Sequence, residues 1–234
     1  LVLDKSTVCN YRMRIINDDG SEAEMCGNGA RCMASYIVHK FAVVPEVFTM
    51  ETLAGSIQAM ATGDMASVKL SDPKDYRPNM EIRLASQKMF GHFINTGVPH
   101  MVIFVQGLQE VDVNDLGRII RHHQLFAPQG TNVNFVEQVK EGYLTVRTYE
   151  RGVEAETLAC GTGSVASALV GYLLGAEKPA PAKGVLIKVV PRSGEMLDVT
   201  FDLDIKEDKP VITNVWLKGS GKIICKGEYY YDGV

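Results

Sequence analysis

The sequence of 234 residues has no long hydrophobic run and no concentrated charge. No apolar stretch reaches the roughly 18 residues of a membrane span, and the first residues lack the order of charged, apolar and small residues found in a signal peptide. Lys and Arg form no dense run, and the formal net charge is -4. The electrostatic footprint of nucleic-acid or anionic-membrane binding is therefore missing. These absences predict a cytoplasmic protein with a small-molecule partner, no nucleic acid and no membrane.

Cysteine is also scarce, and the five cysteines are an odd number. A chain that is 46% hydrophobic can bury a core without covalent staples. We therefore expect free thiols in a reducing compartment. Because Leu1 to Leu3 has the character of the middle of an apolar run, we expect an upstream segment to be missing. The cysteines are Cys9, Cys26, Cys32, Cys160 and Cys225.

Short β-runs separated by Gly, Pro or Asp make up most of the chain. They are expected at 11–16, 47–53, 56–61, 66–70, 90–96, 101–105, 132–136, 144–149, 185–190, 197–201, 211–216 and 223–229. One surface helix is expected to begin with Asp112 as N-cap and to include Leu116, Ile119 and Ile120.

Two further helices are each opened by a Cys-Gly-x-Gly turn and are apolar or small on all sides. They are expected over about 27–38 and 161–174, the second ending at Gly175. A Glu stands four residues before each cysteine: Glu22 before Cys26, and Glu156 before Cys160. This long-range repeat predicts two homologous halves.

The predicted fold is α+β, with two pseudo-symmetric halves that each wrap a mixed, strand-rich sheet around a central helix. The N-terminal half would span residues 1–72, incomplete at its start and joined by a terminal strand within 221–234. The C-terminal half would span 73–220. The break is placed near 71–78, where Asp, Pro and Lys cluster.

A thiol just before a helix lies at the positive end of the helix dipole, among N–H groups without intrahelical partners. This position favours thiolate, and the same N–H groups can hold a carboxylate. Two such motifs facing one cleft could remove a proton from one side of a carbon and return one to the other. Fixed dipoles would meet the developing charge, so neither a metal nor pyridoxal phosphate is required.

The two motifs resemble the signatures of the diaminopimelate epimerase family. The first match runs from Asn17 to Cys32 and contains Glu22 and Cys26. The second joins Glu150-Arg151-Gly152 to Glu156-Thr157-Leu158-Ala159-Cys160-Gly161-Thr162-Gly163. The segments 96–100 and 132–135 also fit, so the resemblance covers nearly the whole chain.

The resemblance implies a cofactor-independent epimerase that interconverts LL- and meso-diaminopimelate in lysine and cell-wall biosynthesis, located in a plastid if the source is a plant. Cys26 and Cys160 would be acid and base, and His100 and Glu150 would support them. A homodimer is the assembly to test. The substrate-binding residues would be Asn17, Gly27, Asn28, Asn132, Glu150, Arg151, Gly161 and Thr162.

Two departures from the family pattern stand out. Many members have Asn where this chain has Val98, which removes one side-chain contact to substrate. The family also begins with an N-terminal segment containing an Asn-Asp-Phe motif, which we do not find in these residues. We expect that segment to be lacking.

Other interpretations remain open. Within enzymes, the rival is another cofactor-free racemase on the same fold, of the proline racemase type; phenazine-pathway isomerases of this fold use a carboxylate instead of two thiols. A non-catalytic thiol switch, a zinc-binding protein or an assembly subunit are further readings, although Cys26 and Cys32 lack structural zinc spacing. Asn17 also suits a simple turn, Glu150-Arg151 a surface pair, and His100 an ordinary loop position.

Overall fold

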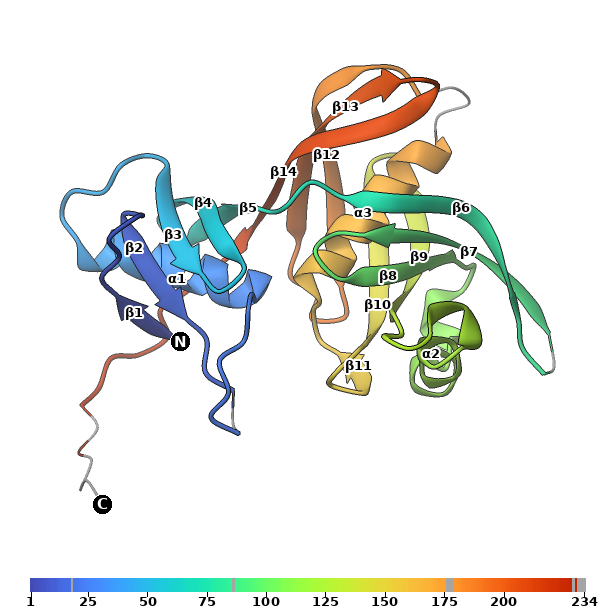
Figure 1. The fold of residues 1–234 in the computed structure, drawn as a ribbon, viewed down its shortest axis with the longest axis horizontal. Coiled ribbons are helices and arrows are strands. Elements are labelled where there is room, and N and C mark those ends of the chain that lie inside the picture. The colour runs from blue at the N-terminus through green and yellow to red at the C-terminus, as the bar shows by residue number, and fades with distance from the viewer. Residues whose placement is uncertain (18, 86, 176–178, 229, 231–234) are drawn as a thin grey trace.

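The computed structural model describes residues 1–234 except 18, 86, 176–178, 229 and 231–234. Figure 1 shows two lobes side by side, joined by two passages of the chain. The first lobe contains β1 (Val2–Asp4), β2 (Tyr11–Arg14), α1 (Gly27–Lys40), β3 (Phe48–Thr52), β4 (Gly55–Thr62) and β5 (Met65–Lys69). The second contains β6 (Lys74–Arg83), β7 (Lys88–Asn95), β8 (Pro99–Phe104), α2 (Val113–Arg121), β9 (Asn132–Lys140), β10 (Tyr143–Glu150), β11 (Ala155–Thr157), α3 (Gly161–Gly175), β12 (Ala182–Pro191), β13 (Leu197–Lys206) and β14 (Lys209–Ser220).

Hydrogen bonds link the strands of both lobes in one continuous order, β1-β2-β3-β4-β5-β14-β13-β12-β10-β9-β8-β7-β6, with β11 beside β10. The pairs β2–β3, β8–β9 and β10–β12 are parallel, and the other pairs are antiparallel. The predicted mixed, strand-rich α+β fold is confirmed.

Each lobe packs its strands against one central helix, as the repeated motif predicted, and the second lobe adds α2 against β9, β10 and β11. Helix α1 lies against β4, β5 and β14, whereas α3 lies against β7, β8, β9, β10, β12 and β13. The residues of α3 are almost all apolar or small, and most are buried. The surface helix α2 begins where expected, because the Asp112 carboxylate accepts a hydrogen bond from Asp115 N–H at 3.0 Å.

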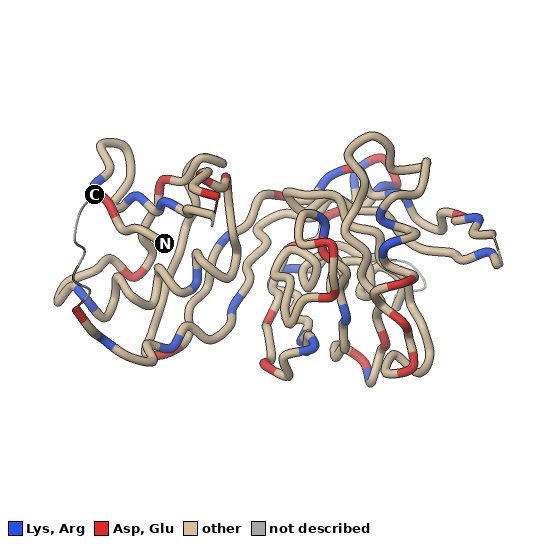
Figure 2. Tube along the Cα trace, turned by 90° about the horizontal axis from the view of Figure 1, so that it is seen from below, with Lys and Arg blue, Asp and Glu red and all other residues tan. Residues whose placement is uncertain are grey.

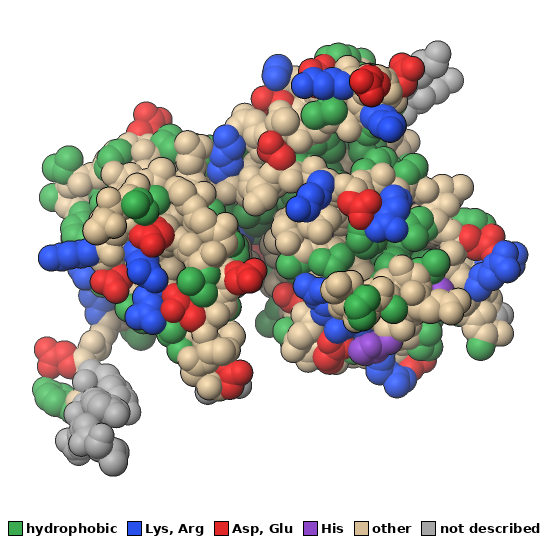
Figure 3. All heavy atoms as spheres, viewed as in Figure 1, with side chains coloured by type: hydrophobic (Ala, Val, Ile, Leu, Met, Phe, Trp, Pro, Cys, Tyr) green, Lys and Arg blue, Asp and Glu red, His purple; other side chains and the backbone are tan. Residues whose placement is uncertain are grey.

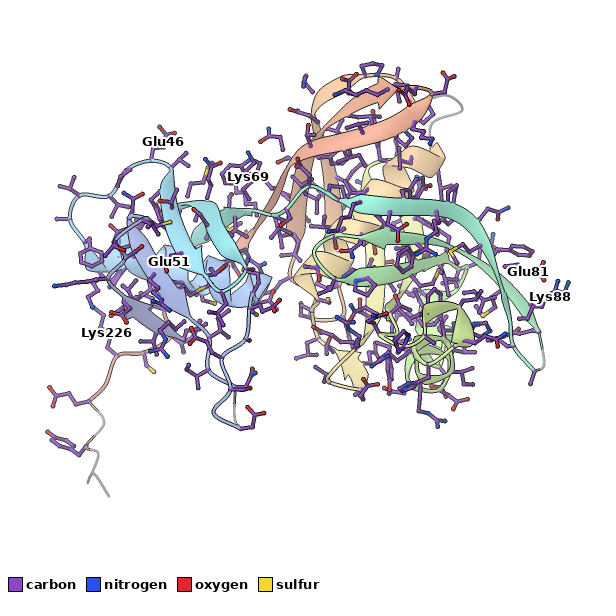
Figure 4. The ribbon with its side chains drawn as sticks, viewed as in Figure 1. Glu46, Glu51, Lys69, Glu81, Lys88 and Lys226 are labelled. Carbon is purple, nitrogen blue, oxygen red and sulfur yellow. The ribbon has the colours of Figure 1, made fainter. Side chains whose placement is uncertain are left out.

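Strand β14 carries the chain from one lobe to the other. It pairs with β13 along most of its length, and its last residues pair with β5, from Trp216 opposite Lys69 to Ser220 opposite Met65. Lys69 lies beside the other passage between the lobes (Figure 4). The two halves therefore share a strand.

The terminal strand expected at 223–229 is wrong for the residues that the structure describes. Residues 222–228 have no strand and are exposed, and Tyr229 lies outside the described residues. The reason is the length of the partner: β5 begins at Met65, opposite Ser220, so a continuing strand would have nothing to pair with. The strand that connects the halves is β14.

Strand β6 was missed because its sequence resembles a break. Asp75 and Asn79 adopt positive φ, and the register against β7 shifts between Lys74 and Met80. These are β-bulges, which tolerate Asp, Asn and Pro. Beyond the bulges the hairpin is regular, and Glu81 of β6 pairs with Lys88 of β7 at 3.2 Å (Figure 4).

Leu217 of β14 packs under the first turns of both central helices. It is fully buried. A Cβ atom added to Gly161 would lie 3.0 Å from Leu217 Cδ2, and one added to Gly27 would lie 3.8 Å from the same atom. Both helix N-termini therefore rest on one leucine side chain, and the closer of the two contacts, at position 161, favours glycine.

We expect Leu217→Ala to lower the free energy of unfolding by about 2–5 kcal/mol, since it removes buried methyl groups and leaves a cavity under both helices. Leu186→Ala, on strand β12 of the same sheet with Leu186 46% exposed, is the matched control. It should cost less than about 1 kcal/mol. Urea unfolding measures both, and equal losses would contradict the role of Leu217.

Candidate active site

Cys26 forms the N-cap of α1. Its backbone is extended, with φ -143° and ψ 114°, and its sulfur accepts a hydrogen bond from Gly29 N–H at 3.4 Å. The side chain is exposed. A Cβ atom on Gly29 would lie 3.6 Å from the sulfur. The Cys-Gly-x-Gly turn thus holds an accessible thiol at the positive end of a helix.

Cys160 occupies the matching position before α3 but is buried, with 5% of its surface exposed. Burial raises the pKa of the Cys160 thiol to about 12, and the negative charge of Glu150 acts in the same direction. The Thr162 hydroxyl and Gly163 N–H oppose this shift by hydrogen bonding to the sulfur. Two equivalent motifs therefore hold thiols in unequal surroundings.

Both cysteines line a single cleft of about 1070 Å³ between the lobes. Figure 3 shows the surface hollowed there. The motifs also touch directly, because Asn28 Nδ2 donates to Ala159 O at 3.3 Å while Asn28 Oδ1 accepts from buried Arg31 at 2.9 Å. The N–H groups of the first helical turns have no intrahelical partner. One cleft is therefore lined by four residues whose backbone N–H groups have no partner within their helix, namely residues 27, 28, 161 and 162.

His100 lies behind the cleft, fully buried, with Nε2 3.0 Å from Thr162 Oγ1. Thr162 Oγ1 in turn lies 3.6 Å from Cys160 Sγ. Burial lowers the pKa of His100 to about 3, with a further contribution from the positive charge of Arg151. His100 is therefore a neutral imidazole that reaches Cys160 through Thr162.

Asn132, Glu150 and Arg151 line the same cleft. Asn132 Oδ1 accepts from Arg151 N–H at 2.8 Å, and Asn132 Nδ2 donates to Pro99 O at 2.9 Å. The amide therefore holds the turn that carries Arg151 against β8. Val98, at the position where many members of the resembled family have Asn, also lines this cleft and presents an apolar side chain.

Asn17 is the one predicted site residue that the structure places away from both the cleft and the His100 network. Its N–H donates to Ser21 O at 2.9 Å, its carbonyl accepts from Gly20 N–H, and its side chain donates to Ser21 Oγ. These contacts are those of a tight turn. In the structure Asn17 therefore acts as a turn residue, which was the alternative interpretation of its sequence.

The repeated Glu residues have a structural role that sequence reasoning did not assign. Glu22 pairs with Arg14 of β2 at 3.1 Å, and Glu156 pairs with Arg147 of β10 at 2.7 Å. The Glu156 side chain is 2% exposed and also pairs with Arg192 at 2.6 Å. Each carboxylate ties the segment before a cysteine to a strand of its own lobe. The equal spacing of the two Glu residues from the cysteines is the sequence feature from which this shared structural role could have been predicted.

No group of His, Cys, Asp and Glu among the described residues could hold a metal ion. Within the same part of the chain, no helix is long and apolar enough to cross a membrane. Figure 2 shows charges of both signs distributed over both lobes. The cleft is the site with the most complete set of reactive and polar groups.

Solved structures related to this chain share its fold. A probable proline racemase from Agrobacterium radiobacter superposes with a TM-score of 0.70 at 16% identity, over 93% of this chain and 72% of that one. A phenazine biosynthesis protein of the PhzF family from Bacillus anthracis gives 0.68 at 16% identity, over 93% of this chain and 80% of that one. At such low identity these matches concern the fold alone.

Sequence comparisons are more specific. The diaminopimelate epimerase family model matches residues 1–74 and 92–194. The diaminopimelate epimerase of Hydrogenobaculum sp. is 42% identical over 97% of this chain and 78% of its own length. That of Aquifex aeolicus is 45% identical over 93% of this chain and 74% of its own length. This chain, with a cysteine directly before each of two helices at one cleft, belongs to the diaminopimelate epimerase family.

Proposed function

We propose that this chain interconverts LL-2,6-diaminopimelate and meso-diaminopimelate by proton transfer between the substrate α-carbon and two cysteines, Cys26 and Cys160. The observation that carries the proposal is the arrangement of these residues at the starts of two helices that border one cleft. Each helix start offers N–H groups for an anion beside a thiol for proton transfer.

The reacting α-carboxylate would bind between the two helix starts, where the N–H groups of Gly27, Asn28, Gly161 and Thr162 can donate to it. An α-carbon is a very weak acid, so abstraction of its proton requires stabilisation of the charge that develops. Dipoles already fixed in place provide that stabilisation without reorganisation. The proposed reaction therefore uses the chain's own groups and no cofactor.

From the unequal surroundings of the thiols we infer different roles at rest. With its pKa raised to about 12, Cys160 is a protonated thiol at neutral pH and serves as the acid. When Cys160 is the acid, a Cys26 thiolate takes the α-proton from one face of the carbon. The proton of Cys160 then goes to the opposite face. The products are a Cys26 thiol and a Cys160 thiolate, and the reverse reaction exchanges the roles.

The second amino-acid end of the substrate would meet Arg151, Asn132 and Glu150. A guanidinium binds a carboxylate through two parallel hydrogen bonds, and a carboxylate such as Glu150 can accept from an ammonium. Asn132 would act mainly by holding Arg151, since Asn132 Oδ1 accepts from Arg151 N–H. We place Asn17 in this group on family resemblance alone.

The organisation of the protein follows the same proposal. Residues 1–72 and 73–220 would form the two halves, with catalysis between them and a homodimer as the assembly to test. All five cysteines are free thiols in the structure, which suits a reducing compartment. This supports a location in the cytoplasm, or in a plastid if the source is a plant.

The first prediction concerns inversion at the α-carbon. In heavy water, the parent should convert LL- to meso-diaminopimelate and incorporate deuterium. Cys26→Ala and Cys160→Ala should each lower the rate of inversion about 10²- to 10⁴-fold, since each removes one proton-transfer group. Cys32→Ala, which alters an exposed cysteine on α1, is the matched control. Inversion that survives in either of the first two variants would contradict the two-thiol reaction.

The second prediction concerns thiol reactivity under reducing conditions. Iodoacetamide should label Cys26 well before Cys160 at pH 7, because Cys160 is buried and protonated. Labelling of Cys160 should still be rising at about pH 10, since a raised pKa displaces thiolate formation to higher pH. Glu150→Gln should speed Cys160 labelling, because it removes a negative charge that raises this pKa. Peptide mapping over time measures these rates, and a slower Cys160 in Glu150→Gln would overturn the assignment.

The third prediction separates the substrate from that of a proline racemase. Arg151→Gln should raise the KM for diaminopimelate roughly 10- to 100-fold, as expected when a charge-assisted pair is lost. Arg118→Gln, at an exposed position on α2, is the control and should leave KM unchanged. Excess proline should not inhibit the parent. Proline turnover that is insensitive to Arg151→Gln would instead favour the racemase alternative.

A further inference from the structure

Asn134 of β9 is a fully buried side chain whose contacts surround His100. Asn134 Nδ2 lies 3.1 Å from His100 Nδ1 and donates to Met101 O at 3.2 Å. On its other side, Asn134 Oδ1 accepts from Thr148 Oγ1 at 3.0 Å. Asn134 is not among the residues that line the cleft, so it lies one layer behind the reacting groups.

The orientation of the Asn134 amide follows from one of these partners. Met101 O is a backbone carbonyl and can only accept, so the atom facing it must be the NH2 group. The same NH2 group faces His100 Nδ1. His100 Nδ1 must therefore accept and carries no proton.

This constraint settles the proton position on His100. Burial lowers its pKa to about 3, so the ring is neutral and carries a single proton. With Nδ1 unprotonated, the proton is on Nε2, 3.0 Å from Thr162 Oγ1. Thr162 Oγ1 accepts a hydrogen bond from Nε2–H, and its own hydroxyl hydrogen is free to point at Cys160 Sγ, 3.6 Å away. The opposite tautomer would turn the hydroxyl hydrogen toward His100 and away from the sulfur.

We propose that Asn134 is a positioning residue for Cys160: it holds His100 as the Nε2–H tautomer and thereby makes the Thr162 hydroxyl a hydrogen-bond donor to the Cys160 sulfur. The inference deepens the proposed function and rests on it for its catalytic meaning. A sulfur that receives a directed donor is better able to carry negative charge.

The donor matters because the other surroundings of Cys160 disfavour its thiolate. Burial and Glu150 both raise the pKa of the thiol, whereas the Thr162 hydroxyl and Gly163 N–H lower it. Arg151 acts on His100 and helps to keep the ring neutral. In the direction that starts with Cys160 as base, the oriented hydroxyl is one of two groups that assist thiolate formation.

The tautomer can be read directly from 15N chemical shifts of the parent chain labelled at its five histidines, with His100→Gln used to assign the His100 signals. We expect Nε2–H in the parent and Nδ1–H in Asn134→Asp, where a carboxylate can only accept. Thr148→Val is the matched control, since it removes a hydrogen bond to the same amide but leaves Nδ2 in place. It should keep the Nε2–H form. An Nδ1–H tautomer in the parent would overturn the proposal.

The link to the sulfur is tested by a double-mutant cycle on Cys160 alkylation at a fixed pH of about 9. Thr162→Val should slow alkylation roughly tenfold, because a donor to the thiolate is lost, and Thr162→Ser should restore it. In the Asn134→Asp background the same Thr162→Val change should have no further effect, since the hydroxyl already points away. An equal tenfold loss in both backgrounds would refute the coupling.

The cycle also removes a complication, because the new carboxylate in Asn134→Asp disfavours a nearby thiolate by charge alone. That effect is common to both members of the Asn134→Asp pair and cancels in the comparison. Neither measurement depends on turnover. If the parent fails to invert diaminopimelate, the proposed function fails, while the tautomer and the cycle still decide the role of Asn134.

Discussion

The convergence of two helix starts on one cleft is the constraint on which the rest of the structure depends. Peptide N–H groups at a helix start need partners, and burying them without partners is costly. Here the residues that carry these groups line a cleft, where the carboxylate of the proposed substrate would satisfy them. The close approach is favoured by glycine at position 161, where α3 contacts Leu217, and by a strand, β14, that pairs with strands of both lobes. The arrangement of the halves and the cleft thus have the same structural origin.

Much of this could be predicted from the sequence because it is local. The Cys-Gly-x-Gly turns, the apolar helices after them and the Asp112 cap are short-range patterns with a direct physical cause, and the structure contains all three. The pairing of strands is not local. A strand at 223–229 had the right residue types, but its formation depended on where β5 begins. Strand β6 is the reverse case, because it formed although the sequence did not predict it. Its bulged segment contains Pro78 and two positive-φ residues, which are typical of a loop.

The site could be predicted to a similar extent. Residues that follow from the motifs, such as Gly27, Gly161 and Thr162, line the cleft with the two cysteines. The roles of Asn134, Thr148 and Arg31 could not be predicted, because each depends on a hydrogen bond to a residue far away in the chain or on burial. Asn17 illustrates the converse, since its turn contacts are all within four residues and are evident from the composition of the segment.

A reversible two-thiol reaction needs two groups that can each be acid and base, yet the two sulfurs here are not equivalent. One is exposed at a helix start, and the other is buried next to Glu150. Burial protects the Cys160 thiol and keeps its proton available, but it also makes the return step, from a Cys160 thiolate, the costly one. A hydrogen-bonded chain that runs from buried Asn134 and His100 through Thr162 to that sulfur offsets this cost. It keeps its direction because His100 remains neutral at ordinary pH. The asymmetry of burial therefore calls for an asymmetric polar network, and the structure has one on the Cys160 side.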